Sequence, residues 1–265
     1  MNNIKRRTHA CQGIDGVLQC RMKITVLGCS GGYPAPGGAT TGYLVSFAGK
    51  NILIDMGSGV LSNLLQYISL GDIDLILLTH HHSDHVCDIP VFKYALQMNK
   101  QNGTDIHTIP VFAPSTPKAA FDLLSHDTNL VCGHIGASTI LPVFGGRAYF
   151  FRTQHPVECY GIRLEYEGKV FVYTGDACYN PDLIPLLRDA DLAIMDCGAL
   201  EKQRKPVMMH LTPTECHSLY RDAGIKKVVL SHLVPYYSIS EIQEEADSCG
   251  IWPYEIASVH KEFEI

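Results

Sequence analysis

The sequence predicts an α/β fold in which two packed β-sheets are flanked by helices. The chain has 265 residues, enough to bury a sizeable core in one large domain. After residue 22, short β-branched runs alternate with helix-like stretches, and the turns between them carry Gly, Pro, Asn or Asp. The β-rich segments form two groups, each with its own helices, and no linker separates them. Because each group must bury its apolar faces, we expect one compact domain over residues 22–265.

Ten short apolar segments are expected to form strands. They are rich in branched and aromatic residues and are bounded by turn residues, which is typical of strands. The expected strands are Ile24–Gly28, Tyr43–Phe47, Asn51–Asp55, Leu75–Thr79, Thr108–Phe112, Ala148–Arg152, Gly161–Glu165, Val170–Thr174, Leu192–Asp196 and Lys227–Ser231.

Six longer segments are expected to form helices. They are Gly59–Ser69, Ile89–Asn99, Thr116–Ser125, Pro181–Arg188, Thr212–Ala223 and Ile239–Cys249. Two of them have clear start signals. Thr212 is followed by Pro213 and, three residues on, by Glu215, which is the pattern of a capping box. Ser240 is expected to cap the last helix, because the acidic residues behind it suit the positive end of a helix dipole.

The composition is that of an ordinary globular protein, with 46% hydrophobic and 18% charged residues. The formal net charge of −6 argues against a protein that holds nucleic acid by bulk electrostatics. Ten cysteines are spread irregularly without a C-x-x-C pair, so we expect reduced thiols and a cytoplasmic location. No apolar run approaches the roughly 18 residues of a membrane span, so no membrane partner is expected.

The first 21 residues stand apart from the alternating pattern. They contain Lys5, Arg6 and Arg7 with no apolar stretch behind them, which argues against a secretory signal. Met22 directly precedes the first expected strand. We therefore expect residues 1–21 to be a poorly ordered N-terminal extension and Met22 to be the functional start.

A polar cluster at the end of an apolar strand carries most of the chemistry. The run Leu75–Leu78 is followed by Thr79-His80-His81-His82-Ser83-Asp84-His85. Such a run is typical of a strand buried on both faces, and ligands bind beyond the carboxyl ends of strands in these sheets. His80 and His82 are two residues apart, so their imidazoles project together if the backbone stays extended. Because imidazole and carboxylate groups are ligands for zinc and similar ions, we expect a metal site here.

These residues resemble the metallo-β-lactamase superfamily, whose motif is H-x-H-x-D-H after a buried strand. The later motifs of that superfamily are matched in order by His155 before Pro156, by Asp176 after an apolar strand, and by His232 at a strand end. The resemblance covers nearly everything from Met22 to about Val234. It implies a four-layer αββα sandwich with the site at one edge, between the two sheets.

The resemblance also implies a site for two divalent metal ions. His80, His82 and His155 would bind one ion, and Asp84, His85 and His232 the other. Asp176 and a water or hydroxide would bridge the ions, which lower the pKa of that water and so supply the nucleophile. The donors suit zinc first, with manganese or iron as alternatives set by availability. A flavodiiron branch has a glutamate where this chain has His82, which counts against a redox role.

His210 is expected to be catalytic, together with Asp84. It lies in Met209-His210-Leu211-Thr212, just before the well-capped helix. The ribonuclease Z and cyclic-nucleotide phosphodiesterase-like branch has a histidine in a similar H-x-T setting, where it is thought to donate a proton to the leaving oxygen or to bind a phosphate. The segments Leu27–Pro34 and Tyr160–Arg163 also resemble that branch.

The resemblance favours a phosphodiesterase acting on a small phosphodiester such as a cyclic nucleotide. Ribonuclease Z has a Gly/Pro-rich arm that clamps transfer RNA, and this chain has no such insertion. The acidic H-E-A-T-type motif of that enzyme is also missing, since the strand end reads Met195-Asp196-Cys197-Gly198. RNA 3′-end processing stays an alternative, as do thioesterase, glyoxalase II-like and lactonase reactions. A non-catalytic binding module is disfavoured because all seven expected ligands are present.

Three further polar residues are expected to support the site. Asp55 ends a strand, and the resemblance suggests that it holds histidine ligands from behind. Ser30 and Thr41 are expected on the pocket floor. His81 should point away from the metals. For the assembly, a homodimer is the default expectation.

Overall fold

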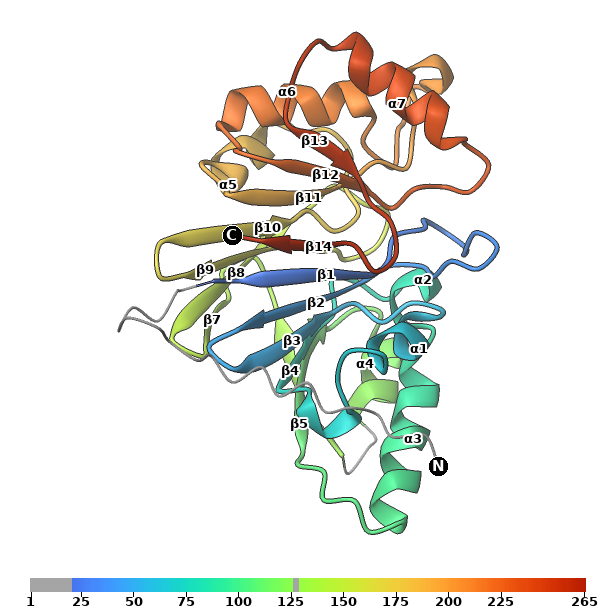
Figure 1. Cartoon of the computed structure of the whole chain (residues 1–265), viewed down its shortest axis with the longest axis vertical. Coiled ribbons are helices and arrows are strands. Elements are labelled where there is room, and N and C mark those ends of the chain that lie inside the picture. The colour runs from blue at the N-terminus through green and yellow to red at the C-terminus, as the bar shows by residue number, and fades with distance from the viewer. Residues whose placement is uncertain (1–20, 126–128) are drawn as a thin grey trace.

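The structure, a computed structural model, describes residues 21–125 and 129–265. Two seven-stranded sheets pack face to face, and helices cover their outer sides (Figure 1). This is the four-layer αββα sandwich, so the predicted fold class is confirmed. The expectation of an N-terminal extension lies, apart from Arg21, outside the described residues.

The first sheet is built mainly from the first half of the chain. Its spatial order is β14 (Glu262–Glu264), β1 (Lys23–Gly28), β2 (Gly42–Phe47), β3 (Lys50–Ile54), β4 (Leu75–Leu77), β5 (Ile109–Pro114) and β6 (Leu130–Ile135). The strands from β14 to β3 pair antiparallel, and those from β3 to β6 pair parallel. The carboxyl ends of β3 and β4 therefore lie at the same edge of the sheet.

The second sheet is built from the second half of the chain. Its order is β13 (Tyr254–Ile256), β12 (Val228–Ser231), β11 (Leu192–Asp196), β10 (Lys169–Tyr173), β9 (Tyr160–Tyr166), β8 (Gly146–Arg152) and β7 (Ile140–Val143). The strands from β7 to β10 pair antiparallel, whereas β10 to β13 are parallel. The carboxyl ends of β10, β11 and β12 therefore meet at one edge.

Helices form the two outer layers (Figure 1). Those of the first half are α1 (Val60–Leu64), α2 (Ser83–Val86), α3 (Ile89–Gln101) and α4 (Lys118–Ser125). Those of the second half are α5 (Ile184–Leu187), α6 (Pro213–Ala223) and α7 (Ile239–Ser248). Short 3-10 turns lie at Leu70–Asp72, Pro181–Leu183 and Glu201–Gln203. Among the described residues, no helix has the length and apolar character needed to cross a membrane.

Alternating strand residues fill three apolar layers. In β3, Ile52 and Ile54 face the layer between the sheets, and Leu53 faces the helices of the first half. In β10, Phe171 belongs to the central layer, and Val172 packs under the helices of the second half. Successive side chains of a strand point to opposite faces of the sheet, which explains this alternation. The inward-facing side chains pack the two sheets together behind the polar strand ends.

Two local expectations are wrong. The helix expected over Gly59–Ser69 is α-helical only at Val60–Leu64, because Ser69 starts a separate 3-10 turn through a capping box with Asp72. The cap of α7 is Ser238 and not Ser240, because only Ser238 has Glu241 at the third helical position, as a capping box requires. The capping box expected at Thr212 and Glu215 is present.

Candidate metal centre

Five polar side chains gather at the carboxyl ends of parallel strands. In the first sheet, Asp55 directly follows β3 and His80 comes shortly after β4. In the second sheet, Asp176 follows β10, Asp196 ends β11, and His232 follows β12. All five are buried. The site therefore lies where the edges of the two sheets meet, as the strand-end pattern of the sequence predicts.

Three imidazoles and a carboxylate form the first group of donor atoms. The Nδ1 atom of His82 lies 3.0 Å from Nε2 of His80 and 3.1 Å from Nε2 of His155. The Oδ2 atom of Asp176 is 3.6 Å from Nε2 of His80 and 3.7 Å from Nε2 of His155. One donor atom from each of the four residues lies within 4.8 Å of the others. The structure thus brings together residues that are up to 96 positions apart, from 80 to 176.

A second group lies on the other side of Asp176. The Oδ2 atom of Asp84 is 3.5 Å from Nε2 of His85 and 3.1 Å from Nε2 of His232. The Oδ1 atom of Asp176 is 3.2 Å and 3.4 Å from the same two nitrogens. The two oxygens of Asp176 therefore face one group each.

The outer nitrogens of two histidines are held from behind. The Nδ1 atom of His85 donates to Oδ2 of Asp55 at 2.8 Å, and Nδ1 of His80 lies 3.1 Å from the hydroxyl of Thr79. Asp55 also accepts from the backbone and the hydroxyl of Thr79, each at 2.8 Å. With these contacts, Nε2 of both rings is directed at the donor groups, which is the support expected of Asp55.

Burial keeps the first three imidazoles neutral. It lowers the pKa of all three below the usual value for histidine; the residues are His80, His82 and His155. A neutral imidazole has a lone pair available, and that is the form in which histidine binds a metal.

The carboxylates make the second group attractive to positive charge. Burial alone would lower the pKa of His85, but Asp176 and Asp55 raise it to about 10. Burial also opposes a charge on His232, yet Asp176 and Asp196 raise its pKa well above the usual range. The electrostatic field of these carboxylates therefore favours a cation at this position.

The donor atoms fit divalent ions. The Nε2 atom of His85 and Oδ1 of Asp176 are buried without a hydrogen-bond partner among the described residues, and they lie 3.2 Å from each other. Buried polar atoms without partners are costly, and a metal ion is one of the few groups that satisfies both. The residues of the two groups that could hold such ions are His80, His82, Asp84, His85, His155, Asp176 and His232, and a third group of donor atoms joins Asp196 and His210 to Asp176 and His232.

His210 lies against this centre and is oriented by Asp196. Its ring stacks on that of His232, with centroids 4.8 Å apart, and its side chain is 24% exposed. Its Nδ1 atom donates to Oδ2 of Asp196 at 2.9 Å. Burial alone would lower the pKa of His210, but the charge and hydrogen bond of Asp196 raise it. The arrangement therefore favours a His210 that carries a proton at the edge of the site.

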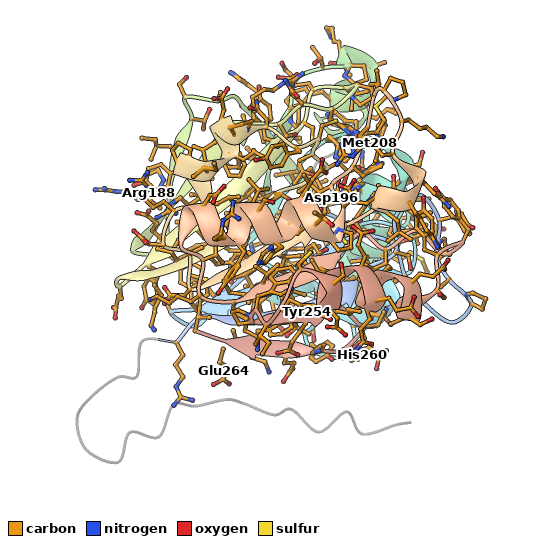
Figure 2. All side chains as sticks on the ribbon, turned by 90° about the horizontal axis from the view of Figure 1, so that it is seen from above. Arg188, Asp196, Met208, Tyr254, His260 and Glu264 are labelled. Atoms are coloured by element: carbon orange, nitrogen blue, oxygen red, sulfur yellow. The ribbon has the colours of Figure 1, made fainter. Side chains whose placement is uncertain are left out.

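Asp196 is a site residue that sequence reasoning missed. In the sequence, the strand end that contains Asp196 indicates only that the H-E-A-T-type motif is missing, and it assigns Asp196 no role. Its carboxylate is fully buried and accepts from the backbone N–H groups of Ala177 and Gly198. Figure 2 labels Asp196 toward one end of α6, with Arg188 toward the other. The available signal is the one that marks Asp176: a carboxylate at the end of an apolar strand.

Two glycines leave room for the rings of the site. A Cβ atom on Gly198 would lie 2.9 Å from Cγ of His210, and one on Gly31 would lie 2.7 Å from the ring of His232. Real Cβ atoms do not approach so closely, so any side chain at these positions would displace a histidine. Gly31 belongs to the segment whose small residues were expected near the site.

The contacts of Ser30 and Thr41 hold segments of the backbone near the site in place. The hydroxyl of Ser30 accepts from the backbone of Ala35, and the backbone N–H of Thr41 donates to the carbonyl of Asp84. The hydroxyl of Thr41 is buried without a hydrogen-bond partner among the described residues. His81 donates to the carbonyl of Pro114, the last residue of β5, at 2.7 Å.

Comparison with known proteins gives a consistent result. A family model described as a β-lactamase superfamily domain matches residues 50–233. The probable metallo-hydrolase YhfI of Bacillus subtilis (strain 168) is 33% identical over 228 residues, covering 85% of this chain and 92% of that protein. Ribonuclease Z of Haloarcula marismortui is 26% identical over 286 residues, covering 85% of this chain and 91% of that protein.

A solved structure agrees with these matches. The crystal structure of the metallo-β-lactamase fold protein YhfI from Bacillus subtilis superposes with a TM-score of 0.88 at 31% sequence identity. The superposition covers 92% of this chain and 99% of that chain. The family match over residues 50–233 contains all the donor residues from His80 to His232.

Proposed function

This chain belongs to the β-lactamase superfamily and is a metallo-hydrolase, and from this premise we propose that it cleaves a small phosphodiester such as a cyclic nucleotide. The observation that carries the proposal is the hydrogen bond between His210 and Asp196 beside a complete set of metal-binding donors. Cleavage of a phosphodiester needs a nucleophile, charge neutralisation on the phosphoryl group, and a proton for the leaving oxygen.

The donor groups are proposed to hold two divalent ions. His80, His82 and His155 would bind one ion, while Asp84, His85 and His232 would bind the other, with Asp176 between them. When bound, such ions supply hydroxide near neutral pH and take up negative charge on the phosphoryl oxygens. Zinc is the first expectation, and manganese or iron are alternatives for this donor set.

His210 is proposed to give a proton to the leaving oxygen. Because its Nδ1 atom donates to Asp196, transfer to the substrate falls to Nε2. Asp196 raises the pKa of His210, which favours the protonated ring that a general acid needs. A general acid of this kind typically contributes about 10²- to 10⁴-fold to the rate. Hydrolysis of a thioester needs this proton less, because a thiolate leaving group is a weak base.

Processing of RNA 3′ ends is the second candidate, because a relative with 26% identity is named ribonuclease Z. A protein that holds RNA along its backbone needs many cationic contacts, and the formal net charge here is −6. Together with the absence from the sequence of a Gly/Pro-rich clamping insertion, this charge favours a small substrate over RNA.

A substrate panel tests the proposal. The protein, supplied with zinc or manganese, is assayed with bis-p-nitrophenyl phosphate, cyclic AMP, precursor transfer RNA, S-lactoylglutathione and an acyl lactone. We expect turnover of the first two, and we expect His210→Ala to lower it while metal content stays the same. His217→Ala, a histidine of α6 away from the donor groups, is the matched control. Turnover of the thioester or lactone without any phosphodiester would contradict the proposal.

A further inference from the structure

A cavity of about 580 Å³ opens beside the metal centre, and His155 lines both. The cavity is also lined by Cys178, two residues after Asp176, and by Met209, directly before His210. It therefore adjoins the groups proposed to bind metal and to transfer a proton. A volume of this size is typical of sites for small molecules. Figure 2 labels Met208, another lining residue, near Asp196.

The walls of the cavity combine apolar side chains with one amide. Val207 and Met209 are 70% and 44% exposed at the rim, and the half-buried Tyr179 lies in the wall. The side chain of Gln154 is exposed and makes no hydrogen bond within the described part of the chain. An amide both donates and accepts, so it can pair with the edge of a heterocycle whose faces contact apolar side chains. An acyl chain would leave this amide unused.

One cation at the rim stands outside the ion pairs that line the cavity. Arg204 is occupied by two carboxylates, because it pairs with Glu201 and with Glu215, the latter at 2.7 Å. The next residue, Lys205, also lines the cavity and has no ion-pair partner over residues 21–125 and 129–265. Lys205 is therefore the lining cation that is free, among the described residues, to contact an anionic group of a ligand.

The segment from Arg204 to Met208, which carries Lys205 and Val207, is held at both ends. Its first end is fixed by the pairing of Arg204 with Glu215 in the capping box of α6. Its other end is fixed by the thiol of Cys178, which donates to the carbonyl of Met208 at 2.6 Å. Lys205, Pro206 and Val207 between these two contacts are therefore positioned over the cavity before any ligand arrives, which lowers the entropic cost of binding.

We propose that this cavity binds the nucleoside part of the substrate. Gln154 pairs with the edge of the base, Val207 and Met209 cover its face, and Lys205 counters the negative charge of the phosphate. The assignment rests on the proposed phosphodiesterase function and deepens it, because it makes the substrate a nucleotide diester and not any small diester. A mononucleotide product would bind in the same place.

Two diesters with the same leaving group test the assignment. Thymidine 5′-(p-nitrophenyl phosphate) carries a nucleoside, and methyl p-nitrophenyl phosphate does not. We expect the wild type to prefer the nucleoside diester in kcat/KM, and Gln154→Ala and Val207→Ala each to reduce that preference about tenfold, chiefly through KM. Gln101→Ala and Val91→Ala change exposed residues of the same types on α3, and they should leave the preference as it is.

A binding measurement without turnover provides the second readout. Calorimetric titration of the metal-loaded protein with AMP should show saturable binding that Gln154→Ala weakens about tenfold and Gln101→Ala does not. Hydrolysis of both diesters by the wild type, with equal preference in all variants, would overturn the cavity assignment and leave the phosphodiesterase proposal standing. Hydrolysis of neither diester by the wild type would instead contradict the proposed function itself.

Discussion

The Nδ1 atom of His210 lies 2.9 Å from Oδ2 of Asp196, while Oδ1 of the same carboxylate lies 3.4 Å from Nδ1 of His232. One buried carboxylate therefore contacts both the proposed proton donor and a proposed metal ligand. Backbone N–H groups of Ala177 and Gly198 fix that carboxylate in place. The position of the proton donor relative to the metals is thus set at the end of β11, a rigid part of the sheet.

Replacing Asp196 with Asn should slow the reaction. The amide keeps the shape of the side chain but removes the negative charge that raises the pKa of His210. We expect kcat to fall about 10- to 100-fold, as for other groups that orient site residues. Metal content and kcat are measured on the same sample. Asp222→Asn, which changes an exposed residue paired with Arg221, is the control, and an unchanged kcat in Asp196→Asn would contradict the role.

Replacing Gly198 with Ala should displace His210 without touching the metal donors. The new Cβ atom would lie 2.9 Å from Cγ of His210 and 3.2 Å from Oδ1 of Asp196, so the ring must move. Because a displacement of about 1 Å can cost about 100-fold, we expect a clear loss of turnover at unchanged metal content. At Gly71 the same substitution meets no atom closer than 3.7 Å, so Gly71→Ala should keep full activity. Equal activities of Gly198→Ala and Gly71→Ala would show that turnover does not depend on the position of the His210 ring.

Replacing Asp55 with Asn should weaken metal binding and not proton transfer. Asp55 accepts from Nδ1 of His85 and from Thr79, and so directs Nε2 of His85 at the donor group. The loss of such a partner typically weakens metal affinity about 10- to 100-fold. Competition with a fluorescent zinc chelator measures the affinity, and excess metal should restore most of the turnover. An affinity equal to that of the wild type would exclude this role for Asp55.

Removing the metals should lower the thermal stability of the wild type. The carboxylates of Asp84 and Asp176 are buried or nearly so, and ions that bind only the folded state stabilise it by mass action. At a metal concentration about 100 times Kd, the expected gain is about 2.7 kcal/mol. Scanning calorimetry with and without EDTA should show the shift. In His80→Ala, EDTA should shift the unfolding temperature much less. A shift in that variant as large as in the wild type would place the stabilising metal elsewhere.

The fold and the donor residues could be predicted because their signals are local. Apolar strands that end in His, Asp or Gly are visible in short windows, and the spacing at His80 to His85 is specific. Four strands escaped prediction, namely β6, β7, β13 and β14, and the last two have weak local signals. In β14, only Phe263 is buried, and in β13 all three residues are only partly buried. Strands β14 and β13 form because β1 and β12 offer open edges for pairing.

The partnership of Asp196 and His210 could not be predicted from spacing. The two residues are 14 positions apart and come from the end of β11 and the loop before α6. Their contact depends on how α6 packs on the second sheet, which buries Cys216 and Leu219. The cavity escaped prediction for the same reason, since Gln154, Cys178 and Lys205 lie on three separate segments.

The number of metal ions per chain tests the central claim most directly. Plasma mass spectrometry of protein that has been loaded with zinc or manganese and freed of unbound metal gives that number. The arrangement of Asp176 between two donor groups predicts two ions per chain in the wild type, and clearly fewer in His155→Ala and in His232→Ala. One ion per chain or less in the wild type would contradict a two-metal centre.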